Sequence, residues 1–232
     1  MDLLDRVLDA GRDLLGRVDT ALVVGGAPPD HPIWPVARRV GALPGDAVES
    51  LAALRPDPLL GCAARLRAIA GGYAHQHATL ASLTGSVAWE GAGAEAFTGQ
   101  VRAFAGHLGP GTDDGPGTDD RTDDSLVGRL AATASYVDDV ATWIAETRQA
   151  LAGALATVLV CAEAVSLRTG GDTGQSRAAA AIGTRILETV ESVHHAGMAV
   201  HARWAGRLGE VAYRSPDGTP GPSDRSVTRV SL

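Results

Sequence analysis

The chain has 232 residues, which is enough for one or two domains. Hydrophobic residues make up 45% of the chain and aromatic residues only 4%, because much of the apolar content is alanine, a residue that favours helices in close contact over a thick core. The formal net charge is −7, and this acidic balance excludes the broad basic face that binding to nucleic acid requires.

The start of the chain does not resemble a leader peptide. Asp2 and Asp5 stand where a signal peptide has basic and then apolar residues. The longest apolar run, residues 151–162, is shorter than the about 20 residues that cross a bilayer, so no transmembrane segment is expected. Cys62 and Cys161 are the only cysteines, and two buried thiols are the preferred interpretation over one disulfide.

Three patterns predict an N-terminal arm made of helices. Residues 2–18 have the spacing of an amphipathic helix, and the Gly- and Pro-rich residues 25–29 end it. Trp34, at the start of a second short helix, is interpreted as an apolar anchor that holds this arm on the bundle, and stacking on a ligand is the less favoured alternative. Asp46, followed three residues later by Glu49, predicts a capping box that opens a third helix.

The first long helix is predicted over residues 59–88. Five apolar residues on it recur every seven positions, with three more beside them: Leu59, Leu66, Tyr73, Leu80 and Val87, flanked by Cys62, Ile69 and Leu83. A strict seven-residue repeat is typical of a left-handed packing seam between helices.

The tripeptide Trp89-Glu90-Gly91 predicts a turn between two helices. Gly91 has access to backbone conformations closed to other residues, and Trp89 is expected to fill the closed end of the turn. The helix after the turn carries an apolar stripe with spacings of four, three and four residues: Phe97, Val101, Phe104 and Leu108.

Residues 89–97, Trp-Glu-Gly-Ala-Gly-Ala-Glu-Ala-Phe, resemble the turn of the Trp-x-Gly (WXG) helical-hairpin superfamily of type VII secretion substrates and their partners. The likeness covers about residues 59–167 and is more specific to longer, functionally uncharacterised actinobacterial members with an extra helix on each side. It implies an all-α fold, an elongated helical bundle built on a long antiparallel helical hairpin with additional N- and C-terminal helices. A generic helix-turn-helix with a buried tryptophan is the alternative, and it carries no link to secretion.

An acidic insertion is predicted over residues 109–124, within the hairpin. Its Gly-Pro-Gly-Thr-Asp-Asp unit occurs twice, and the insertion holds six aspartates and one arginine, a net charge of −5. Repeated Gly-Pro-Gly cannot continue a helix, so a flexible spacer is predicted. Weak Ca²⁺ binding is the alternative, but the unit lacks the Gly and Glu placement of an EF-hand loop.

Helix is predicted to resume at Ser125 and to continue for about forty residues. Six apolar residues spaced seven apart form the predicted pairing seam: Leu130, Val137, Ile144, Leu151, Val158 and Val165. Arg148 interrupts the companion row of apolar residues, and a rim position or an ion pair is expected for it.

These patterns divide the chain into four segments: an N-terminal helical arm (1–58), the hairpin (59–169), a C-terminal packing helix (170–213) and a disordered tail (214–232). The superfamily resemblance implies an export signal of the form Tyr-x-x-x-Asp/Glu, and Tyr213 and Asp217 have that spacing. Pro216 departs from the pattern, because a residue before proline is pushed away from helix. The alternative is that Tyr213 caps the apolar face of the last helix.

No catalytic motif and no known metal-ligand spacing occurs in the sequence. Several histidines and one methionine lie on predicted helices, and a soft-metal site is conceivable there, although solvated helix faces explain them adequately: His75, His77, His194, His195, His201 and Met198. A nucleophile elbow, a phosphate loop and paired Cys-x-x-Cys motifs are all missing. We therefore expect no enzymatic activity, no cofactor and no metal.

Two functions are compatible with these features. The first is a non-enzymatic type VII secretion-associated protein, either an exported substrate or a helix-pairing partner of a co-secreted protein. Its partners are then another helical protein or a second copy, together with the secretion machinery, and it is secreted. The alternative is a cytosolic binding module, such as an immunity protein or a chaperone for a neighbouring toxin. ATPase-dependent export distinguishes the first from tight one-to-one binding in the cytosol.

Overall fold

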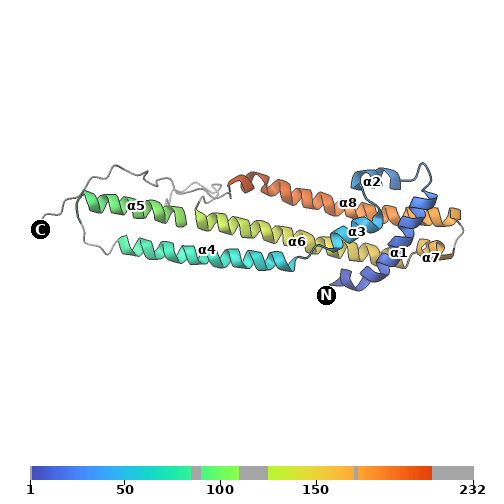
Figure 1. The fold of residues 1–232 in the computed structure, drawn as a ribbon, viewed down its shortest axis with the longest axis horizontal. Coiled ribbons are helices and arrows are strands. Elements are labelled where there is room, and N and C mark those ends of the chain that lie inside the picture. Colours follow the sequence, from blue (N-terminus) through green and yellow to red (C-terminus); the bar gives the residue numbers. More distant parts are fainter. Residues whose placement is uncertain (1, 85–89, 110–124, 170–171, 211–232) are drawn as a thin grey trace. The chain divides into compact units, whose positions relative to one another are not determined.

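The computed structural model describes residues 2–84, 90–109, 125–169 and 172–210. Every regular element within these ranges is a helix, which confirms the predicted all-α class (Figure 1). The helices are α1 (Leu3–Gly25), α2 (Ile33–Val40), α3 (Pro44–Ala52), α4 (Asp57–Thr84), α5 (Ala92–Leu108), α6 (Leu126–Leu159), α7 (Ala162–Thr169) and α8 (Asp172–Glu210).

Contacts between residues divide the chain into two compact units. Unit 1 consists of Met1–Ala64 and Ser135–Gly206, and unit 2 consists of Arg65–Ala134 and Arg207–Leu232. The long helices α4, α6 and α8 therefore contribute residues to both units. The predicted hairpin, with its full extent over residues 59–169, stays a prediction.

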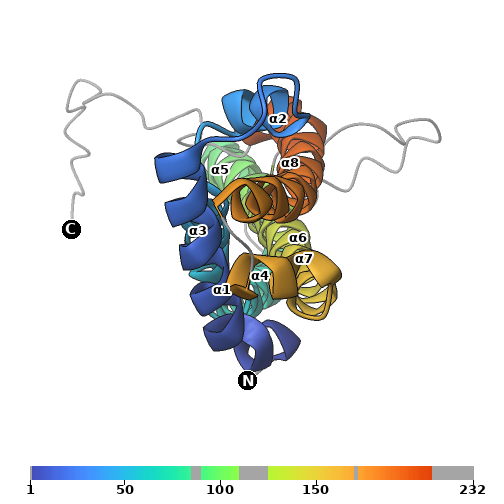
Figure 2. The same ribbon diagram turned by 90° about the vertical axis from the view of Figure 1, so that its right-hand side faces the viewer.

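The core of unit 1 is formed by α1, α2 and α3 together with parts of α6, α7 and α8. Its largest fully buried side chains come from three of these helices: Leu4, Leu14, Leu15 and Val18 of α1, Leu151, Leu155 and Val158 of α6, and Ile182, Ile186 and Leu187 of α8. Helix α1 packs against α3 and α7, at the end of the unit that faces the viewer in Figure 2. A Cβ atom on Gly183 of α8 would lie 2.9 Å from Ile33 and 3.1 Å from Pro44, so glycine permits this close packing.

Helix α1 begins and ends with identifiable signals. The Asp5 backbone N–H donates to Asp2 Oδ1 at 3.0 Å, and the Asp2 N–H donates to Asp5 Oδ2 at 3.2 Å, so the two aspartates form a capping box. The helix continues past the predicted end at Val18 to Gly25 and stops before Gly26, which has a φ of +66°. The Gly- and Pro-rich break therefore ends the helix as predicted.

The neighbours of Trp34, and not Trp34 itself, have the anchor role that was predicted for it. Trp34 is 36% exposed, and its Nε1–H donates to the Pro28 carbonyl oxygen at 2.9 Å, in the segment that connects α1 to α2. Ile33 and Val36 are the buried residues of α2. They hold this short helix on the core.

The predicted capping box of Asp46 and Glu49 is wrong. Helix α3 begins earlier, at Pro44, and its N-cap residue makes no side-chain hydrogen bond. Asp19 of α1 performs the capping instead, because its Oδ2 accepts a hydrogen bond from the Gly45 N–H at 3.1 Å. Glu49 accepts two hydrogen bonds from Arg12 on α1, each 2.8 Å long. The cap is thus a tertiary contact, which local spacing does not reveal.

Thr147 on α6 is a polar residue buried without a hydrogen bond. It is 1% exposed, and its Oγ1 has no partner among the described residues. Thr147→Val is expected to raise the free energy of unfolding by about 1 kcal/mol, since it removes a buried hydroxyl while keeping the shape of the side chain. Urea unfolding followed by circular dichroism measures the change.

Thr184 on α8 provides the matched control for this substitution. It is 8% exposed, but its Oγ1 donates to the Ala180 carbonyl oxygen at 2.8 Å. Thr184→Val removes a satisfied hydrogen bond and is expected to give no gain in stability. Equal responses at the two positions would contradict the assignment of Thr147 as an unsatisfied group.

Candidate functional site

The predicted turn is described in part. Trp89 lies outside the described residues, whereas Gly91 lies directly before α5 and has a φ of +104° and a ψ of 175°. Residues with a Cβ atom rarely adopt this conformation. Helices α4 and α5 meet within unit 2, where a Cβ atom on Gly109 would lie 2.5 Å from the His77 ring.

Gly91→Ala tests the conformation at this turn. The substitution is expected to lower the free energy of unfolding by about 1–3 kcal/mol, because the native φ and ψ lie in a region that only glycine occupies without strain. Gly99→Ala is the control, since Gly99 lies inside α5 and a Cβ atom there meets no other atom within 4 Å. Thermal unfolding of the two variants compares them. A harmless Gly91→Ala would show that the turn relaxes to an ordinary conformation.

The inner face of α5 differs from the predicted stripe. Five of its six buried and half-buried residues follow a spacing of four and three, Ala94, Thr98, Val101, Ala105 and Leu108, and the sixth, His107, lies beside this row. Phe97 and Phe104 instead flank this row and are 51% and 46% exposed. Small residues on the inner face let the helix approach its neighbour closely, so the large rings lie at the side of the contact.

Helix α4 combines the predicted repeat with small residues. Leu59, Leu66, Tyr73 and Leu80 are half-buried, and Ala63 and Ala70 between them are 0% and 7% exposed. Two predicted companions, Cys62 and Ile69, are exposed, and the side chains of Leu83 and Val87 lie outside the described part. The row closest to the neighbouring helices is therefore formed by alanine.

The predicted pairing seam on α6 is mostly internal. Ile144 is 5% exposed, and Leu151 and Val158 are 0% exposed, while Leu130 and Val137 are half-buried. Leu151 and Val158 belong to the core of unit 1. These residues therefore pack within the chain.

The helix predicted to continue through Val165 ends instead at Leu159. Helix α7 follows at an angle of 58°, and Val165 on it is 59% exposed. Ala164 and Leu167 are the buried residues of α7, so the bend turns a different face towards the core. None of the described helices is by itself both long and apolar enough to cross a membrane; only the bent pair α6 and α7, taken together, meets that criterion.

The remaining sequence candidates are exposed or outside the described part. Tyr213 and Asp217 lie outside it, as does the insertion over 110–124. Exposed positions are occupied by His75, His194, His195, His201 and Met198, and His77 is half-buried. Within the described ranges, no group of three His, Cys, Asp or Glu residues is arranged to hold a metal ion.

Both cysteines are free thiols, and Cys62 is exposed, contrary to the expectation that both are buried.

Arg148, for which a rim position or an ion pair was expected, forms ion pairs with Asp2 and Asp5 in a buried position. It is 2% exposed, and its five N–H groups all donate. Nε and Nη2 bind the Asp2 carboxylate, and Nη2 also donates to Asp5 Oδ1 at 2.7 Å. Nη1 donates to the carbonyl oxygens of Ala52 and Leu54. One guanidinium group therefore joins the start of α1 to two carbonyl oxygens at and just after the end of α3.

The charges in this cluster reinforce one another. Hydrogen bonding from Arg148 lowers the pKa of Asp2 from 3.8 to about 2, and hydrogen bonding from Arg55 holds the pKa of Asp5 below its ordinary value. Hydrogen bonding to Asp2 raises the pKa of Arg148. The cluster is therefore fully ionised at neutral pH, although the Asp2 side chain is 44% exposed.

Acid is expected to weaken this cluster within a defined window. Because the pKa of Asp2 is lower in the folded chain, its contribution to stability is complete above its unfolded pKa of 3.8 and is lost as the pH falls towards about 2. The free energy of unfolding of the wild type should fall through that window, and Asp2→Asn should show a shallower fall. Urea unfolding at stepped pH values measures both. Parallel curves would contradict the role of Asp2.

Two tryptophans join α6 to α8 within unit 1. Trp143 Nε1–H donates to the Val193 carbonyl oxygen at 2.8 Å, and its ring lies against Gly197. Trp204 Nε1–H donates to Asp139 Oδ2 at 2.8 Å. These bonds fix the register of the two helices.

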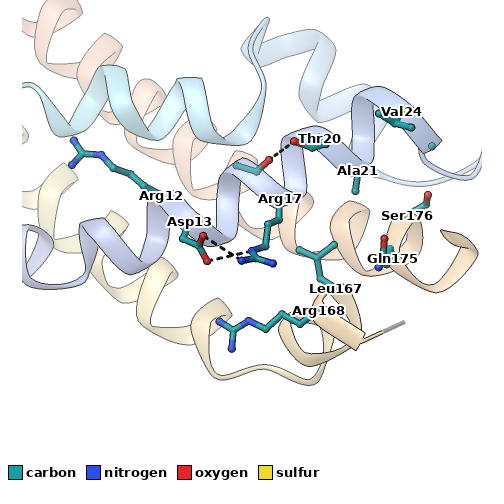
Figure 3. A pocket seen from close by; sticks show the side chains of 12 residues that line it. Arg12, Asp13, Arg17, Thr20, Ala21, Val24, Leu167, Arg168, Gln175 and Ser176 are labelled. Atoms are coloured by element: carbon teal, nitrogen blue, oxygen red, sulfur yellow. Dashed lines mark hydrogen bonds and ion pairs between the residues drawn. The ribbon is translucent and has the colours of Figure 1, made fainter. Parts of the chain in front are cut away.

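A groove of about 650 Å³ lies between α1, α7 and the start of α8 (Figure 3). Its charged lining residues are Arg12, Arg17, Arg168 and Asp13, and its apolar ones include Ala21, Val24 and Leu167. Figure 3 shows the Arg17 side chain extending into the groove from α1 and the Arg168 side chain from α7. The groove thus combines positive charge with an apolar wall.

A second groove, of about 500 Å³, lies between α2, α3, α6 and α8. Trp143 and Val190 contribute to its apolar lining. Arg39 and Glu191 form an ion pair at its edge, and that pairing raises the pKa of Arg39 and lowers that of Glu191. Arg39 and Glu191 in this second groove are already paired with each other, so the groove offers less to a charged ligand than the first one does.

Comparison of the chain with models of protein families, with curated proteins and with solved structures gave no match in any of the three.

Proposed function

We propose that the chain is a non-enzymatic helical protein of type VII secretion, which is exported itself or pairs with a co-exported helical protein. The proposal rests on the resemblance of residues 89–97 to the Trp-x-Gly turn. The positive φ of Gly91 supports it, because a glycine that reverses the chain between two helices needs this freedom.

The observation that carries the pairing function is the aromatic flank of α5. Phe104 is 46% exposed and lies beside an inner row of small residues. A second helix laid along this flank would remove the ring from water, and burial of an aromatic side chain dominates the energy of many protein interfaces. Leu151 and Val158 of the sequence-predicted seam already serve the core of unit 1, so we assign the partner surface to α5.

Fractionation of cells and culture medium tests export directly. Tagged chain is expected in the medium of cells that carry the type VII ATPase and to be missing from the medium of cells without it. Tyr213→Ala and Asp217→Asn should abolish export, whereas Ser215→Ala, in the same segment, should not. Retention in cells that possess the ATPase would refute the secretion proposal and favour a cytosolic binding module.

A further inference from the structure

The groove between α1, α7 and α8 contains positive charge that carboxylates in the described part of the chain do not fully neutralise. Arg12 is engaged, because it donates twice to Glu49 at 2.8 Å and once to Asp9 at 3.1 Å. Among the described residues, Arg17 pairs only with Asp13, four residues earlier on the same exposed helix face, at 3.2 and 3.4 Å. Pairs of this kind contribute little to stability and exchange readily for a better acceptor.

The side chain of Arg168 makes no hydrogen bond or ion pair within the part of the chain that the structure describes. It extends into the groove from α7, opposite Arg17 on α1 (Figure 3). Arg12 is paired with Glu49 and Asp9, and Arg17 with Asp13, so among the described residues the charge of Arg168 is the one in the groove that no carboxylate matches, in a chain whose formal charge is −7. A groove of this charge attracts an anion, and guanidinium groups from two walls can share its oxygen atoms.

We propose that this groove binds a phosphate monoester that carries a short apolar group. A monoester has close to two negative charges at neutral pH and three free oxygens, which match two guanidinium groups. A carboxylate has one charge and two oxygens, and a single arginine satisfies it. The apolar wall accounts for the ester group, because Val24 is 83% exposed at the groove and lies with Ala21 and Leu167 in its lining.

Calorimetric titration of the full chain tests the proposal with three probes: hexyl phosphate, inorganic phosphate and hexanoate. Hexyl phosphate is expected to bind most tightly, and inorganic phosphate about tenfold more weakly because it has no alkyl chain to bury. Arg168→Gln should weaken hexyl phosphate about tenfold or more, since it removes a charge-assisted hydrogen bond. Val24→Ser should weaken hexyl phosphate but leave inorganic phosphate unchanged.

Arg6→Gln is the matched control, because Arg6 is an exposed arginine on α1 outside the groove. It makes the same change in net charge and should leave the affinity for hexyl phosphate unchanged. The proposal is overturned if hexyl phosphate does not bind, if hexanoate binds as tightly, or if Arg6→Gln weakens binding as much as Arg168→Gln. Circular dichroism of each variant confirms that the fold is intact. Export plays no part in this experiment, so its outcome is independent of the proposed secretion function.

Discussion

Replacement of Arg148 by methionine is expected to lower the free energy of unfolding by about 3 kcal/mol, because removal of one partner from a buried charged cluster leaves the other groups without compensation. Arg148 is 2% exposed and provides the five hydrogen bonds that join α1, α3 and α6. Its loss leaves the carbonyl oxygens of Ala52 and Leu54 without this donor. Urea unfolding at neutral pH, where Asp2 and Asp5 are ionised, measures the effect.

Arg55→Met is a matched control for this substitution. Arg55 Nη1 donates to Asp5 Oδ1 at 2.7 Å, the same atom and distance as one bond of Arg148, but the Arg55 side chain is 49% exposed. Solvent replaces an exposed pair easily, so Arg55→Met should cost much less. Arg148→Lys should remain destabilised, because an ammonium group has three donors in place of five. If Arg148→Met and Arg55→Met lower the free energy of unfolding equally, burial of the cluster contributes nothing to stability.

Gly197→Val is expected to lower the free energy of unfolding by about 3 kcal/mol, through overpacking against a rigid ring and loss of a hydrogen bond. A Cβ atom on Gly197 would lie 2.8 Å from Trp143 Cε2 and 2.9 Å from Cζ2. The indole is also held by its bond to the Val193 carbonyl oxygen, so it cannot move aside without breaking that bond. Chemical unfolding measures the loss, and tryptophan fluorescence reports displacement of the ring.

Gly206→Val controls for helix propensity in this experiment. Gly206 lies on the same helix, but a Cβ atom there meets nothing within 4 Å, so valine should be tolerated. Trp143→Leu combined with Gly197→Val should recover part of the loss, since the smaller side chain removes the collision. If Gly197→Val is no worse than Gly206→Val, the close contact between α6 and α8 does not exist in solution.

Sequence spacing predicted the helices well where their signals are local. The seven-residue repeat of α4 predicted its half-buried row, and Gly25 to Pro29 marked the end of α1. The all-α class follows from such repeats and from the glycines and prolines between them. The boundary between α6 and α7 was missed because Val165 continues the seven-residue repeat of α6. In the structure, Ala164 and Leu167 are the residues of α7 that are buried.

Contacts between distant residues could not be predicted from spacing. Asp46 and Glu49 satisfy the local pattern of a capping box, yet Asp19, 26 residues before Gly45, caps the helix. Arg148 interrupts an apolar row and was therefore expected at a rim or in an ion pair. It forms the ion pair, but in a buried position, because α1 and α3 bring carboxylates and free carbonyls to it. The charged groove could not be predicted for the same reason, since Arg17 and Arg168 come to line one groove only after folding.

The bond between Arg148 and Asp2 has a consequence for synthesis on the ribosome, because 146 residues separate its two ends. At about 5–20 residues per second, Arg148 is added about 7–30 s after Asp2. Until then α1 has α2 and α3 beside it but lacks α7, α8 and the rest of α6, which complete the core around its leucines, and the emerging chain presents an amphipathic segment to chaperones. A nascent chain arrested before Arg148 should therefore leave α1 open to protease, whereas the released full-length chain should protect it.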